Sequence, residues 1–128
     1  MLVNMSGGKK VENIINEIVE PVLLWTNPHP TRTFGEQTLN VNTDGYDGLI
    51  LEALYGTYNP DLLGQTFINN LTNNFGVLSV TPGAGKIPNT RTFTVSSNAI
   101  IFDNGRSVSG SDTKHCIPTR IWGVKYTL

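Results

Sequence analysis

The chain has 128 residues, the length of one domain with its own hydrophobic core. Only 15% of the residues are charged and the net charge is −1, so the sequence lacks the basic stripe that nucleic-acid binding requires. Its longest apolar runs are too short for a membrane span or for the core of a signal peptide, and its single cysteine excludes an intrachain disulfide.

Residues 9 to 20 (KKVENIINEIVE) are the only stretch with helical periodicity, and Pro21 ends it. The apolar positions on one face of this predicted helix are Val11, Ile14, Ile15, Ile18 and Val19. Twelve residues do not form a stable helix alone, so the apolar stripe must pack against something. Two interpretations stay open: the stripe packs on its own domain, or it forms a coiled-coil seam that brings identical chains together.

From Pro21 onward the sequence has the pattern of short strands, and 15 Thr, 14 Asn and 13 Gly make up about a third of the chain. This composition is typical of threonine-faced strands joined by Asn and Gly turns. The predicted strands are residues 22 to 26, 36 to 42, 48 to 56, 64 to 70, 75 to 81, 90 to 96, 98 to 103, 106 to 110 and 117 to 127. We therefore predict an all-β fold, an antiparallel and jelly-roll-like β-sandwich over residues 21 to 128, preceded by an N-terminal segment, residues 1 to 20, that contains the helix.

Turn signals separate the predicted strands. They are Thr43-Asp44-Gly45, Asn59-Pro60-Asp61, Asn73-Asn74, Pro82-Gly83-Ala84-Gly85 and Asp103-Asn104-Gly105. The Asn104-Gly105 pair gives the strongest hairpin prediction, because a type I′ turn needs positive φ at both central residues.

Catalytic and metal sites have little support in the sequence. The two histidines, His29 and His115, lie in different predicted loops, and no nucleophile elbow or His-x-His spacing occurs. Paired carboxylates among Asp44, Asp47, Glu52, Asp103 and Asp112 would suit glycoside hydrolysis or a calcium ion, but solvated or turn-capping side chains are the favoured interpretation. We predict no catalytic residue, no metal and no cofactor, and we expect Cys116 to be a buried structural thiol.

Aromatic and polar side chains near the predicted loops are better candidates for binding a glycan, because aromatic faces stack on sugar rings while polar groups bind hydroxyls. The candidate ligand-binding residues are Trp25, His29, Arg32, Tyr55, Tyr58, Asp103, Asn104 and Arg106. The prolines after Asn27 and His29 hold these two residues extended, so the opening stretch also works as a stiff connection between strands. Both faces of the last strand carry apolar residues, which favours Trp122 in the core or at a subunit interface.

Two segments resemble a known group of proteins. Residues 24 to 54 (LWTNPHPTRTFGEQTLNVNTDGYDGLILEAL) and 110 to 125 (GSDTKHCIPTRIWGVK) resemble small β-rich domains of phage and prophage tail modules from Gram-positive hosts, often found at the C-terminal end of tail, baseplate or fibre proteins. The resemblance covers less than half of the chain and assigns no catalytic residue. It implies a virion component assembled in the bacterial cytoplasm, a homotrimer that contacts other tail proteins and binds a host-surface glycan.

Our first hypothesis is thus a non-catalytic tail or fibre head that recognises a host-surface glycan, without nucleic-acid binding or membrane insertion. A monomeric carbohydrate-binding module with Trp25, Tyr55 or Tyr58 as stacking platforms is the alternative. A small glycan hydrolase using Asp44, Asp47 or Asp103 is a third hypothesis. The sequence leaves open whether the chain is a separate protein or part of a longer fibre, and whether it touches the host or only other virion proteins.

Overall fold

The computed structural model describes residues 20 to 126, and the described residues form strands and loops without a helix. The strands are β1 (Val22–Thr26), β2 (Gln37–Asn40), β3 (Gly48–Gly56), β4 (Asn59–Asn69), β5 (Phe75–Val80), β6 (Asn89–Ser96), β7 (Ala99–Ser107), β8 (Gly110–Asp112) and β9 (His115–Val124). The predicted helix lies outside the described residues, together with its positions Val11, Ile14, Ile15, Ile18 and Val19. Within the described part, nothing helical is long and apolar enough to cross a membrane.

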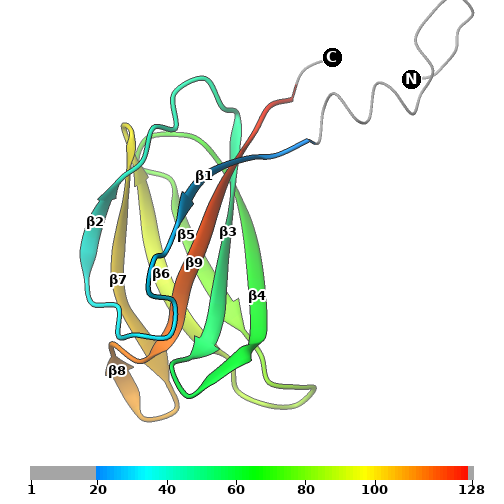
Figure 1. The fold of residues 1–128 in the computed structure, drawn as a ribbon, viewed down its shortest axis with the longest axis vertical. Coiled ribbons are helices and arrows are strands. Elements are labelled where there is room, and N and C mark those ends of the chain that lie inside the picture. Colours follow the sequence, from blue (N-terminus) through cyan, green and yellow to red (C-terminus); the bar gives the residue numbers. More distant parts are fainter. Residues whose placement is uncertain (1–19, 127–128) are drawn as a thin grey trace, which may run out of the picture.

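Two antiparallel sheets face each other (Figure 1). One has the strand order β1-β9-β3-β4, and the other has the order β2-β7-β6-β5 with β8 added beside the end of β7. The prediction of an all-β, sandwich-like fold is therefore confirmed. Because side chains alternate between the two faces of a strand, every second residue of β3, Leu49, Leu51 and Ala53, is fully buried between the sheets. Phe93 and Val95 of β6 meet them from the other side.

The two ends of the sandwich differ. Val22 pairs with Gly123, so the described chain enters and leaves at the same end, which we name the terminal end (Figure 1). The opposite end, the loop end, is formed by the connections at residues 27 to 36, 57 to 58, 81 to 88 and 108 to 114. A partner attached through the chain termini would therefore leave the loop end free.

The predicted hairpin turn at Asn104-Gly105 is wrong. Strand β7 runs through both residues, and the turn lies at Val108 and Ser109, followed by Gly110 with φ 109°. The glycine at position 105 serves a different purpose, because a Cβ there would lie 2.0 Å from the carbonyl oxygen of His115. Gly105 thus allows β7 and β9 to approach closely across the sandwich.

The predicted turn at Asn59-Pro60-Asp61 is also wrong. The chain turns at Thr57 and Tyr58, and β4 begins at Asn59. Pro60 fits in this strand because β4 is an edge of its sheet and its pairing with β3 is irregular between residues 59 and 63. A missing backbone N–H is tolerated at an irregular edge.

Candidate functional site

The candidate site is the loop end, where the structure gathers the predicted ligand-binding residues. Three hydrogen bonds join segments that are distant in sequence: Phe34 N to Thr113 O (2.8 Å), Glu36 N to Asn104 Oδ1 (2.8 Å) and Thr57 N to Lys114 O (2.9 Å). Each of these bonds involves the stretch from residue 104 to residue 114. This stretch therefore fixes the first loop and the β3–β4 turn in one arrangement.

Trp25, His29 and Arg32 line one hollow of about 290 Å³ between the first loop and β2. The indole of Trp25 meets the ring of Phe34 edge to face, with centroids 6.4 Å apart. The buried Asn27 fixes the loop, because its Oδ1 accepts a hydrogen bond from the backbone N of His29 at 2.8 Å. The structure thus brings these three predicted residues together on a rigid connection.

Asp103, Asn104 and Arg106 line a second hollow, of about 310 Å³, on the outer face of β7. They lie along a strand rather than at the tip of a hairpin. The pairing with β6 is irregular between Arg91 and Phe93, which adds a residue to β7 at this point. Asp103 accepts a hydrogen bond from the hydroxyl of Thr92. This hollow offers carboxylate, amide and guanidinium groups to a polar ligand.

Tyr55 and Tyr58 belong to a third cluster, whose other members the sequence did not single out as ligands. The rings of Tyr55 and Tyr58 are in edge contact at 6.1 Å, and Tyr58 meets the imidazole of His115 at 5.4 Å. His115 Nε2 lies 3.2 Å from the Tyr58 hydroxyl, and its Nδ1 lies 2.7 Å from Asp112 Oδ2. Asp112, His115 and Tyr58 therefore form a continuous hydrogen-bonded chain at the loop end. The Asp-x-x-His spacing was the one available signal.

The direction of these hydrogen bonds follows from Asp112. Its partial burial acts to raise the carboxyl pKa, but hydrogen bonds from the backbone N of Lys114 and from His115 outweigh burial and lower the pKa. The carboxylate can accept a proton from Nδ1, and in the tautomer that carries its proton there, Nε2 accepts the hydroxyl proton of Tyr58. Partial burial and the nearby Tyr55 raise the pKa of Tyr58, so the phenol stays protonated at neutral pH. Tyr58 is a neutral hydrogen-bonding ring and not a nucleophile.

A buried arginine, Arg91, fixes the backbone that carries this cluster. The guanidinium of Arg91 is inaccessible to solvent and donates to the carbonyl oxygens of Asp103 (2.6 Å), Cys116 (2.8 Å) and His115 (3.1 Å). It also lies 5.2 Å from the ring centroid of Phe34. Burial lowers the pKa of Arg91 to about 10, so it remains charged at neutral pH.

Cys116 lies next to His115 in an uncommon conformation. Its φ of 51° is in the left-handed region that non-glycine residues seldom adopt. The thiol is buried, as predicted, and burial raises its pKa to about 12. A residue in this conformation persists only where its surroundings fix it, and the Arg91 hydrogen bonds supply that restraint.

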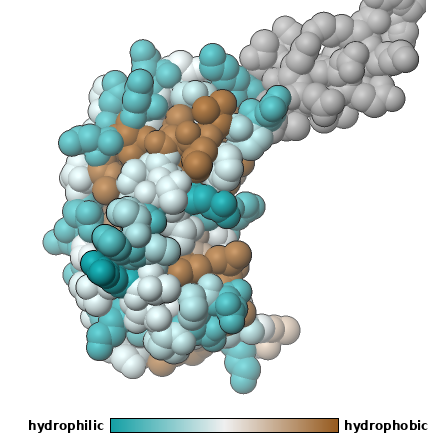
Figure 2. Space-filling model, in the orientation of Figure 1, coloured by the Kyte–Doolittle hydropathy of each residue, from teal (hydrophilic) through white to brown (hydrophobic). Residues whose placement is uncertain are grey.

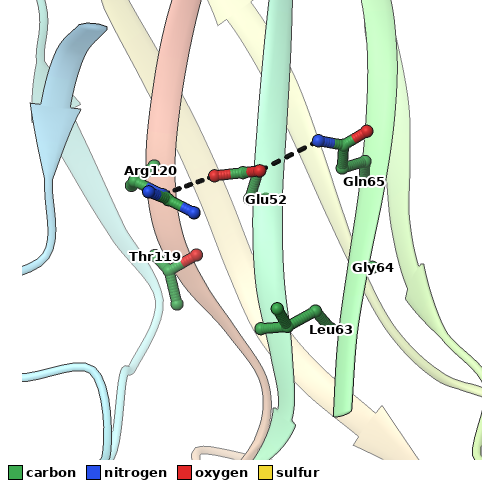
Figure 3. A pocket seen from close by; sticks show the side chains of 6 residues that line it. All are labelled: Glu52, Leu63, Gly64, Gln65, Thr119 and Arg120. Atoms are coloured by element: carbon green, nitrogen blue, oxygen red, sulfur yellow. Dashed lines mark hydrogen bonds and ion pairs between the residues drawn. The ribbon is translucent and has the colours of Figure 1, made fainter. Parts of the chain in front are cut away.

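A further hollow, of about 350 Å³, lies on the outer face of the β1-β9-β3-β4 sheet (Figure 3). Its polar side chains are directed at one another: Glu52 pairs with Arg120 at 2.5 Å and accepts a hydrogen bond from Gln65 at 2.9 Å. Trp122 donates its indole N–H to the same carboxylate at 3.1 Å. Partial burial acts to raise the pKa of Glu52, but these partners outweigh it and lower the pKa.

Trp122 is therefore outside the core. It is half-buried on the outer face of β9, whereas its neighbour Ile121 points between the sheets and is fully buried. The core half of the prediction for Trp122 is wrong, because the alternation of β9 directs residue 122 outward. The subunit-interface half stays a prediction.

Asp103 is far from Asp44 and Asp47, the other two carboxylates of the hydrolase hypothesis. Asp47 lies at the terminal end, just before β3, and accepts a hydrogen bond from the backbone N of Tyr126. Asp103 lies toward the loop end, and a strand of nine residues such as β3 spans about 30 Å. Asp44 shares the terminal-end loop with Asp47, so neither can act with Asp103 on one glycosidic bond.

Comparisons with known protein families, with curated proteins and with solved structures found no match. The resemblance of residues 24 to 54 and 110 to 125 to phage tail domains therefore stays a prediction.

Proposed function

We propose that this protein is a non-catalytic head domain of a phage or prophage tail that recognises a glycan on the host surface through its loop end. One observation carries the proposal: the aromatic and polar candidate residues gather at the loop end, opposite the paired residues Val22 and Gly123 where the described chain enters and leaves. A head attached through its terminal end presents its loop end to a target surface. The phage origin and the contacts with other virion proteins rest on the sequence resemblance.

We further propose a homotrimer, which the outer face of the β1-β9-β3-β4 sheet favours. Leu23, Trp122, Ile50 and Phe67 lie side by side across its four strands. Leu23 is 46% exposed and Phe67 is 52% exposed. Figure 2 shows separate hydrophobic areas on the face of the molecule that it draws. Monomeric proteins seldom leave a contiguous apolar row in water. The outer face of β6, by contrast, carries the threonines 90, 92 and 94.

The topology agrees with a jelly-roll-like description in part of the chain. β1 pairs with β9 and β2 pairs with β7. Such pairing of early strands with late strands is expected of a jelly roll, in which one long antiparallel hairpin wraps into two sheets. The inner strands are joined more simply, since β3 pairs with β4 and β5, β6 and β7 follow one another.

A monomeric carbohydrate-binding module is the second candidate, and the same loop end supports it. The two candidates differ in solution mass, which light scattering on the full chain measures. A trimer whose mass falls on Phe67→Glu favours the tail head, because the substitution places a charge in the apolar row. A monomeric wild type removes the trimer and favours the single module.

Glycan binding is tested on an array of bacterial surface polysaccharides. We expect the wild type to bind, and Trp25→Ala and Arg106→Ala at the loop end to weaken binding. Tyr126→Ala is the matched control, because this exposed tyrosine lies at the terminal end. Binding to no glycan, or equal weakening by the control, contradicts the proposal.

A further inference from the structure

We propose that Tyr58 is a rigid stacking platform for a sugar ring inside a neutral hexose polysaccharide, and that His115 and Asp112 are positioning residues that hold its ring. This inference rests on the proposed function, because it names the group at the loop end that meets the glycan.

Tyr58 combines exposure with order. The residue is 64% exposed. Its ring nevertheless contacts the rings of Tyr55 and His115, with angles of 78° and 77° between the ring planes, and its hydroxyl lies 3.2 Å from His115 Nε2. Contacts that fix an exposed side chain on a two-residue turn contribute little to the stability of the fold. A ring that is already fixed loses less conformational entropy when a ligand binds, so the restraint favours affinity.

The restraint continues into the core. His115 is held by Asp112, whose Oδ1 accepts a hydrogen bond from the backbone N of Lys114 at 2.8 Å. The backbone of His115 and of the left-handed Cys116 is held in turn by Arg91. Strained backbone is concentrated at functional sites, and this strained residue adjoins the imidazole that orients Tyr58.

The shape and charge of the platform indicate the class of ligand. Tyr58 stands on the β3–β4 turn and is largely exposed. We therefore expect its ring to cover one face of a sugar ring and to leave both neighbouring linkages free. Such a surface suits a sugar within a chain, whereas a terminal sugar is better enclosed by a pocket. The phenol is neutral, and its oxygen can still accept a hydrogen bond from a sugar hydroxyl.

The test uses the full chain and isothermal titration calorimetry. The probes are soluble hexaoses of glucose, mannose and galactose, each beside its monosaccharide. We expect a hexaose to bind at least about tenfold more tightly than the monosaccharide, and Tyr58→Ala to lower this affinity about tenfold. Tyr58→Phe keeps the stacking ring but loses the hydrogen bond to His115, so it should weaken binding only severalfold, as His115→Ala does. Tyr126→Ala should change nothing.

The positioning role is tested at His115. His115→Ala should weaken binding severalfold by freeing the ring. His115→Gln should restore part of the affinity, because a glutamine amide can donate to Asp112 and accept from Tyr58. Melting temperatures of all variants separate this effect from a loss of folding, since a purely structural role would move stability and affinity together without rescue by glutamine.

The two proposals fail differently. Wild-type binding that Tyr58→Ala leaves unchanged, or that is equally strong for monosaccharide and hexaose, overturns the stacking platform and leaves glycan recognition elsewhere on the loop end intact. Binding of the wild type to none of the hexaoses, with a positive glycan array, overturns the neutral-hexose platform alone. Silence of both the hexaoses and the array overturns the platform together with the proposed function.

Discussion

Replacing Arg91 by methionine tests whether one buried cation organises the loop end. Methionine has a similar length and no charge, so Arg91→Met removes the hydrogen bonds while keeping much of the packing. Three carbonyl oxygens, a buried one at residue 116 and partly buried ones at residues 103 and 115, then lose their donor. Each unsatisfied group costs about 1–3 kcal/mol, so the three cost about 3–9 kcal/mol together.

Part of this cost is offset because a buried charge disappears. Burial lowers the pKa of Arg91 to about 10, and the fall from the usual value of an arginine corresponds to about 3 kcal/mol spent on keeping the charge inside. From the middle of the hydrogen-bond range, about 6 kcal/mol, the net loss of unfolding free energy is about 3 kcal/mol. That is a large share of the roughly 5–15 kcal/mol that stabilises a domain.

Urea unfolding followed by tryptophan fluorescence measures this loss, with all variants at one protein concentration. The matched control is Arg120→Met, because this arginine is 45% exposed and its ion pair with Glu52 lies at the surface. We expect the control to lose no more than about 1 kcal/mol. The loss of unfolding free energy for Arg91→Lys should lie between those of Arg120→Met and Arg91→Met, since one ammonium group cannot reach all three carbonyls. Equal losses for Arg91→Met and Arg120→Met would refute the reasoning.

Three further predictions follow from single contacts. Gly105→Ala should lower the free energy of unfolding by more than about 3 kcal/mol, or prevent folding as followed by circular dichroism, because its Cβ would lie 2.0 Å from the carbonyl oxygen of His115. Gly35→Ala should fold, because the nearest neighbour of its Cβ would be 3.8 Å away. Similar losses of stability in the two variants would contradict this reasoning. Native Cys116, with its pKa raised to about 12, should not react with a thiol reagent at pH 8 until urea unfolds the chain, so fast native reaction would disprove burial. The pKa of Glu52 is lower in the folded than in the unfolded chain, so its carboxylate stabilises the fold above about pH 4.3, and this stabilisation is lost as the pH falls through the folded pKa. The melting temperature should therefore depend less on pH between about pH 7 and pH 3 in Glu52→Gln than in the wild type. An equal pH dependence in both would count against the Glu52 hydrogen-bond network.

Sequence pattern predicted the bounds of two strands correctly. The first strand, Val22–Thr26, and the central strand, Gly48–Gly56, begin and end at the predicted residues. The errors lie at Asn104-Gly105 and at Pro60, where turn-forming residues are used inside strands. Gly105 is needed because β9 passes directly over it, and Pro60 is accepted because β4 is an irregular edge. Both reasons depend on contacts distant in sequence, which local pattern does not contain.

The same limit applies to the site. Exposure near loops identified Trp25 and Tyr58 as candidates, and the structure gathers their clusters at the loop end. The sequence did not identify His115 and Asp112 as members of the site, because their role depends on the register of β3 against β9. Gly56 pairs with His115, which places Tyr58 beside the imidazole. A one-residue shift of that register would direct the imidazole to the other face of the sheet.

Arg91 connects two of the candidate surfaces at the loop end. Its guanidinium bonds to the carbonyl of Asp103, beside the polar hollow, and to the carbonyl of His115, behind the Tyr58 platform. A neutral side chain could satisfy one of these carbonyls, but only a forked, charged donor reaches three in fixed geometry. Burying this charge costs free energy, and in return the guanidinium fixes the backbone positions of the loop end. If the loop end binds glycan, Arg91→Lys should lower affinity there more than a surface substitution of equal destabilisation, because the carbonyl positions shift while the outer side chains stay the same.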